Sequence, residues 1–102
     1  METYTILQLI YLNDGGEKDF LEFESIVLPL LEKYGGKLMF RIRPASESFV
    51  YPAEGELPYE VHIISFETKD DFLRFKNDPV RAENLHLAES SIKKIILFEA
   101  GA

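Results

Sequence analysis

The segment YTILQLIYL, residues 4–12, decides the fold of this chain of 102 residues. It is rich in β-branched, leucine and aromatic residues, and Gln8 is the polar residue at its centre. This composition predicts a strand buried on both faces, and the Asn-Asp-Gly-Gly sequence of residues 13–16 predicts a turn after it. Both faces of such a strand need cover from other parts of the protein.

Residues 17–34 predict one amphipathic helix. Its apolar residues recur at spacings of three and four, as in Phe20, Phe23, Val27, Leu30, Leu31 and Tyr34. Pro29 lies inside this segment and predicts a kink, because it has no N–H for the Ser25 carbonyl and its ring crowds that carbonyl. Gly35 and Gly36 predict the helix end.

Two further strands are expected at residues 38–43 and 59–66. In the first, alternation places Leu38, Phe40 and Ile42 on one face and Met39, Arg41 and Arg43 on the other. In the second, Glu60, His62, Ile64 and Phe66 share a face. Between them, residues 44–58 form a proline-rich loop in which residues 49–51 predict a short strand.

The last third of the chain predicts a broken helix and a strand. Thr68 followed by Asp71 resembles a capping box that opens a helix with Phe72 and Phe75 inward. Asp78 and Pro79 then predict the cap and first position of a second helical piece. Residues 94–99 predict the final strand.

The order strand, helix, strand, strand, helix, strand predicts an α+β, ferredoxin-like βαββαβ fold, with an antiparallel sheet and two helices on one of its faces. The first and last strands in the chain, residues 4–12 and residues 94–99 apart from their ends, are largely apolar on both sides. A fully solvated open face is therefore not expected, and we predict a homodimer in which two sheets close into an α/β barrel.

Composition narrows the function classes. The 18 Asp and Glu residues outweigh 11 Lys and Arg residues and give a net charge of −7, which argues against binding to nucleic acid or to an anionic membrane surface. Cysteine is absent, which excludes disulfides and thiolate chemistry. We expect a single domain over residues 1–102 and, without signal-peptide features or a long apolar run, a cytoplasmic protein with no membrane span.

The chain also resembles a known family, the small stand-alone dimeric α/β-barrel proteins, and in particular a bacterial branch known only as a domain of unknown function. The resemblance covers nearly the whole chain. It rests on Tyr4, on residues 28–31 with 34–37, on residues 60–66, and on the Asn-Asp-Pro sequence of residues 77–79. It implies the dimeric barrel, and relatives in the superfamily include cofactor-independent oxygenases and isomerases as well as haem-handling proteins. These motifs are structural, so they specify the fold better than the activity.

The strands at residues 38–43 and 59–66 are neighbours in this fold, which brings Arg41, Arg43, Glu60 and His62 to adjacent positions. Such a group could bind a small carboxylate or an oxyanion. Cross-strand charge pairing at a solvated sheet edge explains the same residues without a ligand.

Two more polar residues stand out. Gln8 needs partners inside its strand, and a ligand, a water molecule or a second subunit could supply them. Glu24 lies in the apolar arc of the first helix, where it is either a general base with a raised pKa or the partner of an Arg or Lys. His62 and His86 lack metal-ligand spacing, so we predict no metal and no cofactor.

Two functions remain open. The first is a homodimer that binds a small, partly apolar molecule in a cavity at the sheet face, as a cofactor-independent oxygenase or isomerase. Gln8, Tyr11, Arg41, Arg43 and His62 would line this cavity, His62 and Glu24 are the candidate catalytic residues, and residues 44–58 would cover it. The alternative is a non-catalytic dimeric binding or assembly module, which predicts a filled core without a ligand-sized cavity.

Overall fold

The structure, a computed structural model, describes residues 3–100. Its elements in chain order are β1 (Tyr4–Leu12), α1 (Glu17–Val27), the 3₁₀ helix η1 (Leu28–Tyr34), β2 (Lys37–Ile42), the 3₁₀ helix η2 (Ser46–Ser48), β3 (Glu60–Phe66), α2 (Lys69–Lys76), α3 (Pro79–Glu83), α4 (Leu85–Ser91) and β4 (Ile92–Ala100). None of the described helices is long and apolar enough to span a membrane.

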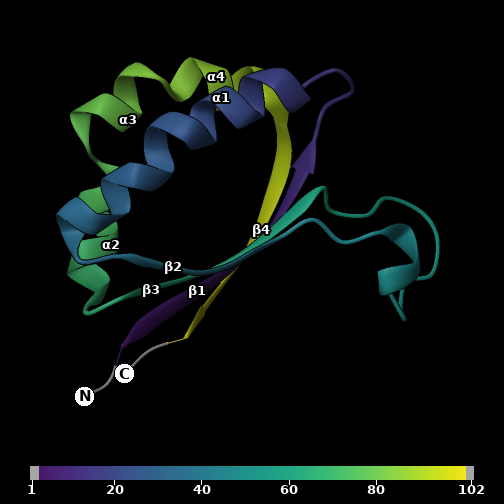
Figure 1. The fold of residues 1–102 in the computed structure, drawn as a ribbon, viewed down its shortest axis with the longest axis horizontal. Helices are drawn as coiled ribbons and strands as arrows, with labels where there is room; N and C mark the ends of the chain where they lie inside the picture. Colours follow the sequence, from purple (N-terminus) through teal and green to yellow (C-terminus); the bar gives the residue numbers. More distant parts are fainter. Residues whose placement is uncertain (1–2, 101–102) are drawn as a thin grey trace.

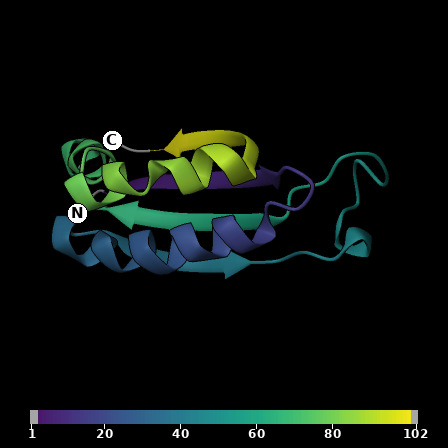
Figure 2. The ribbon, with the colours of Figure 1, turned by 90° about the horizontal axis from the view of Figure 1, so that it is seen from above.

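The four strands form one antiparallel sheet in the order β2-β3-β1-β4. All the helices that pack on the sheet lie on one side of it (Figure 1). Seen from above, α1 runs along the β2 side of the sheet and α4 along the β4 side (Figure 2). The opposite face of the sheet is left without cover.

The hydrophobic core lies between the sheet and the helices. Side chains alternate across a strand, so every second residue of β1, counted from Tyr4, points into the core. On β3 the same holds for every second residue counted back from Phe66. The buried core residues are Tyr4, Ile6, Phe23, Val27, Leu31, Ile64, Phe66, Phe72 and Phe75. Phe66 contacts the rings of both Phe72 and Phe75, at centroid distances of 5.5 and 5.8 Å.

The first helical segment changes type at Pro29. The α-helix ends at Val27, and residues 28–34 continue as a 3₁₀ helix with Pro29 in its first turn. The prediction of one kinked α-helix was therefore wrong. Pro29 lacks the N–H that would bond to the Ser25 carbonyl in a continuous α-helix. In the first turn of the 3₁₀ helix that N–H would have no partner within the helix, so its absence costs no bond there. Gly35 ends the segment with φ at +71°, as expected.

The simple alternation expected for residues 38–43 was also wrong, because β2 contains a β-bulge between Leu38 and Phe40. Leu38 pairs with Ile64 on the helix-covered face, whereas Phe40 pairs with Ile63 on the open face. After the bulge, Arg41 pairs with His62 and returns to the helix-covered face. The extra residue therefore places Leu38 and Arg41, which are three positions apart in the chain, both on the helix-covered face of the sheet.

The connection between β2 and β3 extends beyond the body of the molecule (Figures 1 and 2). Its one regular element is η2, and residues 49–51 do not form the expected strand. Val50 and Tyr51 are 95% and 91% exposed. Near the end of this loop, Glu56 forms ion pairs with Lys93 and Lys94 of β4.

The helical segment after β3 begins and restarts where predicted, but it has three pieces, α2, α3 and α4, instead of the two expected. The Thr68 hydroxyl accepts a hydrogen bond from the Asp71 N–H and caps α2. Asp78 caps α3, with its carboxylate accepting from the Val80 and Arg81 N–H groups, and Pro79 is the first residue of that helix. Phe72 and Phe75 are buried as expected.

Candidate functional site

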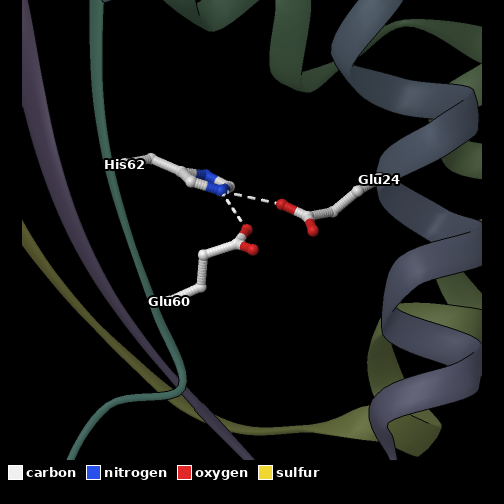
Figure 3. A group of neighbouring side chains, drawn as sticks. All are labelled: Glu24, Glu60 and His62. Carbon is white, nitrogen blue, oxygen red and sulfur yellow. Dashed lines mark hydrogen bonds and ion pairs between the residues drawn. The ribbon is translucent and has the colours of Figure 1, made fainter. Parts of the chain in front are cut away.

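β3 directs two buried polar side chains toward the helices. Glu60 and His62 are two residues apart and share one face of the strand. Their residues are 0% and 3% exposed. Figure 3 shows both side chains pointing away from β3 toward α1. A carboxylate and an imidazole buried in this way need polar partners.

One of these partners is Glu24, which α1 points back toward the sheet (Figure 3). Its Oε2 atom lies 2.7 Å from His62 Nε2, and Glu60 Oε2 lies 2.5 Å from the same nitrogen. Glu24 is buried among the apolar residues of α1. The three side chains, here called the Glu24–Glu60–His62 cluster, therefore converge on one imidazole nitrogen.

Two arginines that follow the bulge in β2 supply positive charges to these carboxylates. Arg41 donates to both carboxylates, with Nη2 2.7 Å from Glu24 Oε1 and Nε 3.2 Å from Glu60 Oε2. Arg43 Nε lies 2.9 Å from Glu60 Oε1. Two guanidinium groups thus face two carboxylates. With both carboxylates ionised, these four groups are neutral together, and protonation of His62 adds one positive charge. Charge pairing does occur here, but Glu60 and Glu24 are buried and do not form a solvated edge.

The surroundings move the three pKa values in different directions. Burial raises the pKa of Glu24. Burial would also raise the pKa of Glu60, but hydrogen bonds, including those from Arg41 and Arg43, outweigh it and lower this pKa to about 2. Burial opposes the charge on His62, yet the adjacent carboxylates of Glu24 and Glu60 prevail and raise the pKa of the imidazole. The cluster therefore keeps a proton to a higher pH than an isolated imidazole would.

Glu24 Oε2 is a buried oxygen without a hydrogen-bond partner in the described part of the chain. It is close to His62 Nε2, but that nitrogen carries at most one hydrogen, and Glu60 Oε2 also lies within reach of it. One oxygen is therefore left free to bind or release a proton.

The same cluster has the chemistry of a metal site. Glu24, Glu60 and His62 each offer a ligand atom, and these atoms lie within 4.8 Å of one another. The spacing of the histidines along the chain gave no sign of this grouping. Arg41 and Arg43 already neutralise both carboxylates, so a cation would bind against two nearby positive charges. The ion pairs explain the cluster better than a metal does.

A cavity of about 380 Å³ lies between the sheet and the helices, beside this cluster. A volume of this size is typical of small-molecule sites. It opens beside β4, where the lining residues Ile95 and Leu97 are 43% and 38% exposed. Its lining is mainly apolar and aromatic, with Gln8, Glu24, His62, Lys76, Arg81 and Glu89 as its polar members.

The structure divides the candidate residues into two groups. Gln8, Glu24 and His62 line the cavity, and Gln8 lies directly opposite His62 in the β1–β3 pairing. Arg41 and Arg43 share their face of the sheet but hold the carboxylates and are not among the lining residues.

Tyr11 is also outside the lining, with its ring 4.5 Å from Lys94 Nζ. The expected cover, residues 44–58, contributes nothing to the lining. The cavity lies on the helix-covered face of the sheet, whereas the expected ligand site was on its open face.

Sequence reasoning did not select Lys76 and Arg81, which the structure also places at the cavity. Arg81 follows Pro79 in a short helix of mixed composition, and no periodicity indicates which way its side chain points. Only the packing of α3 against α1 and α2 brings it to Phe23 and Phe75.

Comparison with known proteins finds similarity in structure alone. No protein-family model matches the chain, and no curated protein matches its sequence. A solved protein of unknown function from Rhodopseudomonas palustris is similar, with a TM-score of 0.81 and 17% identity over 96% of this chain and 80% of that chain.

Two further solved structures extend the similarity. A NIPSNAP family protein of unknown function from Agrobacterium tumefaciens has a TM-score of 0.67 and 18% identity, over 99% of this chain and 87% of that chain. A dimeric protein of unknown function from Bacteroides fragilis, described as having a ferredoxin-like fold, has a TM-score of 0.71 and 12% identity over 98% and 96% of the two chains. The chain has a ferredoxin-like fold.

This ferredoxin-like architecture confirms the α+β class and the order of elements expected from the sequence. At these identities the similarity carries no activity and no ligand, because one fold hosts many functions. The function of this ferredoxin-like chain must be argued from its own cavity and cluster.

Proposed function

We propose that the protein binds a small, partly apolar molecule in the cavity and moves a proton to or from it, as a cofactor-independent isomerase or oxygenase requires. The observation that carries this proposal concerns Glu24, which lines the cavity and has a buried oxygen, Oε2, without a hydrogen-bond partner in the described part of the chain, 2.7 Å from His62 Nε2. A buried carboxyl with a raised pKa is suited to general acid and base catalysis near neutral pH.

In the proposed step, the Glu24 carboxylate removes a proton from a carbon next to a carbonyl group of the bound molecule. The C–H electron pair passes into the carbonyl and forms an enolate, which the imidazolium of His62 stabilises electrostatically. If the bound molecule also has a C=C bond conjugated with this enolate, return of the proton from Glu24 to the far carbon of that bond shifts the double bond and completes an isomerisation. Glu60 and Arg41 act as positioning residues, because each contacts Glu24 or His62 and neither lies in the cavity lining.

The alternative, a non-catalytic binding or assembly module, predicts a filled core. The cavity of about 380 Å³ and the unpartnered carboxylate oxygen favour the first function. The resemblance to dimeric barrel proteins adds support for oxygenase or isomerase chemistry without specifying the substrate.

We also infer that the protein forms a homodimer through the open face of the sheet. This face carries exposed apolar side chains on its two edge strands, namely Phe40, Ile42, Ile96 and Phe98. A second copy of the same face would bury them, and the similar protein from Bacteroides fragilis is described as dimeric.

Binding is tested first by ligand-observed NMR titration with a neutral aromatic probe, 2-naphthalenemethanol. Ile95 and Ile96 are neighbours on β4, but Ile95 lines the cavity and Ile96 lies on the open face. We expect Ile95→Trp to fill the cavity and abolish binding without changing the oligomeric state. The matched variant Ile96→Trp should weaken the dimer and retain binding. Equal loss of binding in both variants would contradict the cavity as the binding site.

Proton transfer is tested with 2-tetralone, a ketone with acidic C–H bonds next to its carbonyl group. The protein should accelerate exchange of these protons for deuterium in D₂O, and Glu24→Gln or His62→Gln should reduce the acceleration by roughly 100-fold or more. His86→Gln is the control, since this exposed histidine is outside the cavity. If Glu24→Gln exchanges as fast as the wild type, Glu24 is not the base.

A further inference from the structure

Arg81 is held at the cavity by the local structure of α3. The carboxylate of Asp78 accepts hydrogen bonds from the N–H groups of Val80 and Arg81, at 2.8 and 3.2 Å. Tyr34 and Lys33 also bind Asp78, so the cap is fixed to η1. The helix start that presents Arg81 is therefore rigidly connected to the rest of the helical layer.

The guanidinium group of Arg81 lies among aromatic rings. Its central carbon is 5.9 Å from the ring centroids of both Phe23 and Phe75. Among residues 3–100 it makes one hydrogen bond, in which Nη1 donates to the Lys76 carbonyl oxygen at 3.1 Å. A guanidinium has five N–H donors, so most of its hydrogen-bonding capacity is left over.

The environment of Arg81 differs from that of the other three arginines. Arg41, Arg43 and Arg74 each form an ion pair with a carboxylate. Within residues 3–100, Arg81 has no such partner, and its burial lowers the pKa of the guanidinium without an opposing effect from any acid. A partly buried cation without a carboxylate is an unfavourable arrangement unless an anion from outside completes it.

The other charged residues of the cavity strengthen this contrast. Lys76 also contributes to the lining, so a second positive charge is available there. Glu89 is the acidic residue of α4 in the lining, but it is exposed and forms no ion pair with Arg81. Glu24 is already bound by Arg41.

We propose that Arg81 binds the carboxylate of an apolar, aromatic carboxylic acid whose hydrocarbon part fills the cavity. The inference rests on the proposed function, because it assigns the ligand class of the same cavity. A guanidinium and a carboxylate match each other through two parallel hydrogen bonds, and the aromatic lining packs against a flat ring. The ligand is thus selected by charge as well as by apolar contact.

The test compares two probes of nearly equal shape, 2-naphthoate and 2-naphthalenemethanol, which differ in charge. The wild-type protein should bind 2-naphthoate about tenfold more tightly or better, the difference expected for one charge-assisted pair. Arg81→Met keeps an apolar stem over Phe23 and Phe75 but removes the charge, so it should lose this preference and still bind the alcohol. Arg74→Met, which removes a surface arginine outside the cavity lining, should behave as the wild type.

The results separate the two proposals. If the wild type binds both probes equally, the cavity is a binding site but Arg81 does not select an anion. If neither probe binds, the proposed function fails together with this inference. If Arg81→Met keeps the preference for 2-naphthoate, the anion site lies elsewhere. Should circular dichroism show that Arg81→Met is unfolded, the pair Arg81→Lys and Arg81→Gln decides the matter, since only the lysine variant should keep a preference.

Discussion

Glu24 of α1 and His62 of β3 meet across the layer between helices and sheet, with Glu24 Oε2 2.7 Å from His62 Nε2. Both residues are buried, and the Arg41 guanidinium holds the other oxygen of Glu24. This contact joins the two layers of the fold through ionisable groups, so its protonation affects stability as well as the proposed chemistry.

The contact predicts a dependence of stability on pH above neutrality. The pKa of His62 is about 6.5 in the unfolded chain and higher in the folded protein. Protonation therefore stabilises the fold fully below pH 6.5, and this stabilisation is lost as the pH rises through the folded-state pKa. Urea unfolding at a series of pH values should show a declining free energy of unfolding in this window. His62→Gln should flatten the decline, whereas the exposed control His86→Gln should leave it unchanged.

At acid pH the free energy of unfolding changes with pH in the opposite direction, because of Glu60. Its pKa falls from 4.5 in the unfolded chain to about 2 in the folded protein. The ionised carboxylate therefore stabilises the fold above pH 4.5, and this contribution is lost as the pH falls toward 2. Glu60→Gln should reduce the free energy of unfolding at neutral pH by about 1–3 kcal/mol, since it leaves the half-exposed Arg43 without a carboxylate and Arg41 with Glu24 alone. The same change at Glu56, an exposed ion-pair residue, should have little effect, and equal losses would show that burial of Glu60 is unimportant.

We predict that an alanine substitution causes a steric clash at Gly36 but not at Gly35. A Cβ atom at Gly36 would lie 2.7 Å from Phe66 Cε1 and 3.1 Å from the Leu31 carbonyl oxygen, whereas one at Gly35 would meet open space. Gly36→Ala should cost about 1–3 kcal/mol because the buried Phe66 ring must move. Gly35→Ala should cost about 1–2 kcal/mol, from its positive φ alone.

A double-mutant cycle distinguishes these two causes. Phe66→Leu lacks the Cε1 atom and should relieve part of the cost of Gly36→Ala, but none of the cost of Gly35→Ala. Thermal and urea unfolding of the single and double variants measure the coupling. Strict additivity of Gly36→Ala and Phe66→Leu would contradict the steric explanation.

The open face of the sheet predicts the oligomeric state. Phe98 lies on this face opposite Leu7 and is 55% exposed in the single chain. Phe98→Asp should place a charge in the proposed interface and shift the mass from two chains to one in sedimentation equilibrium. Val50→Asp, at the 95% exposed loop position, should leave the mass unchanged. A wild-type protein that sediments as a single chain would contradict the proposed dimer.

Much of the fold was accessible from the sequence because its signals are local. The alternation of residues 60–66, the cap at Thr68 and the Asp78-Pro79 restart each depend on residues close together in the chain, and each is found where it was expected. Sequence patterns did not predict the 3₁₀ helix that begins at Leu28 or the bulge between Leu38 and Phe40. Both depend on backbone hydrogen bonds that hydrophobic periodicity does not report.

The candidate site was accessible only in part. Glu24 attracts attention in the sequence because a carboxylate interrupts an apolar arc, and Gln8 because an amide interrupts an apolar strand. Arg81 gives no such signal, since a charged residue in a short surface helix is ordinary. Its lack of a carboxylate partner is a property of the packed protein.

Neighbouring residues and regular periods in the sequence specify the order of strands and helices along the chain, the capped helix starts and the apolar character of both sheet faces. Three relationships arise only when the chain packs: Glu24 and Arg41 meet at His62, the cavity lies under the helices, and Arg81 has no carboxylate partner within residues 3–100. These relationships depend on one extra residue in β2 and on how α1 and α3 pack over the sheet. Residues distant in the chain fix both features together, so local pattern does not specify them.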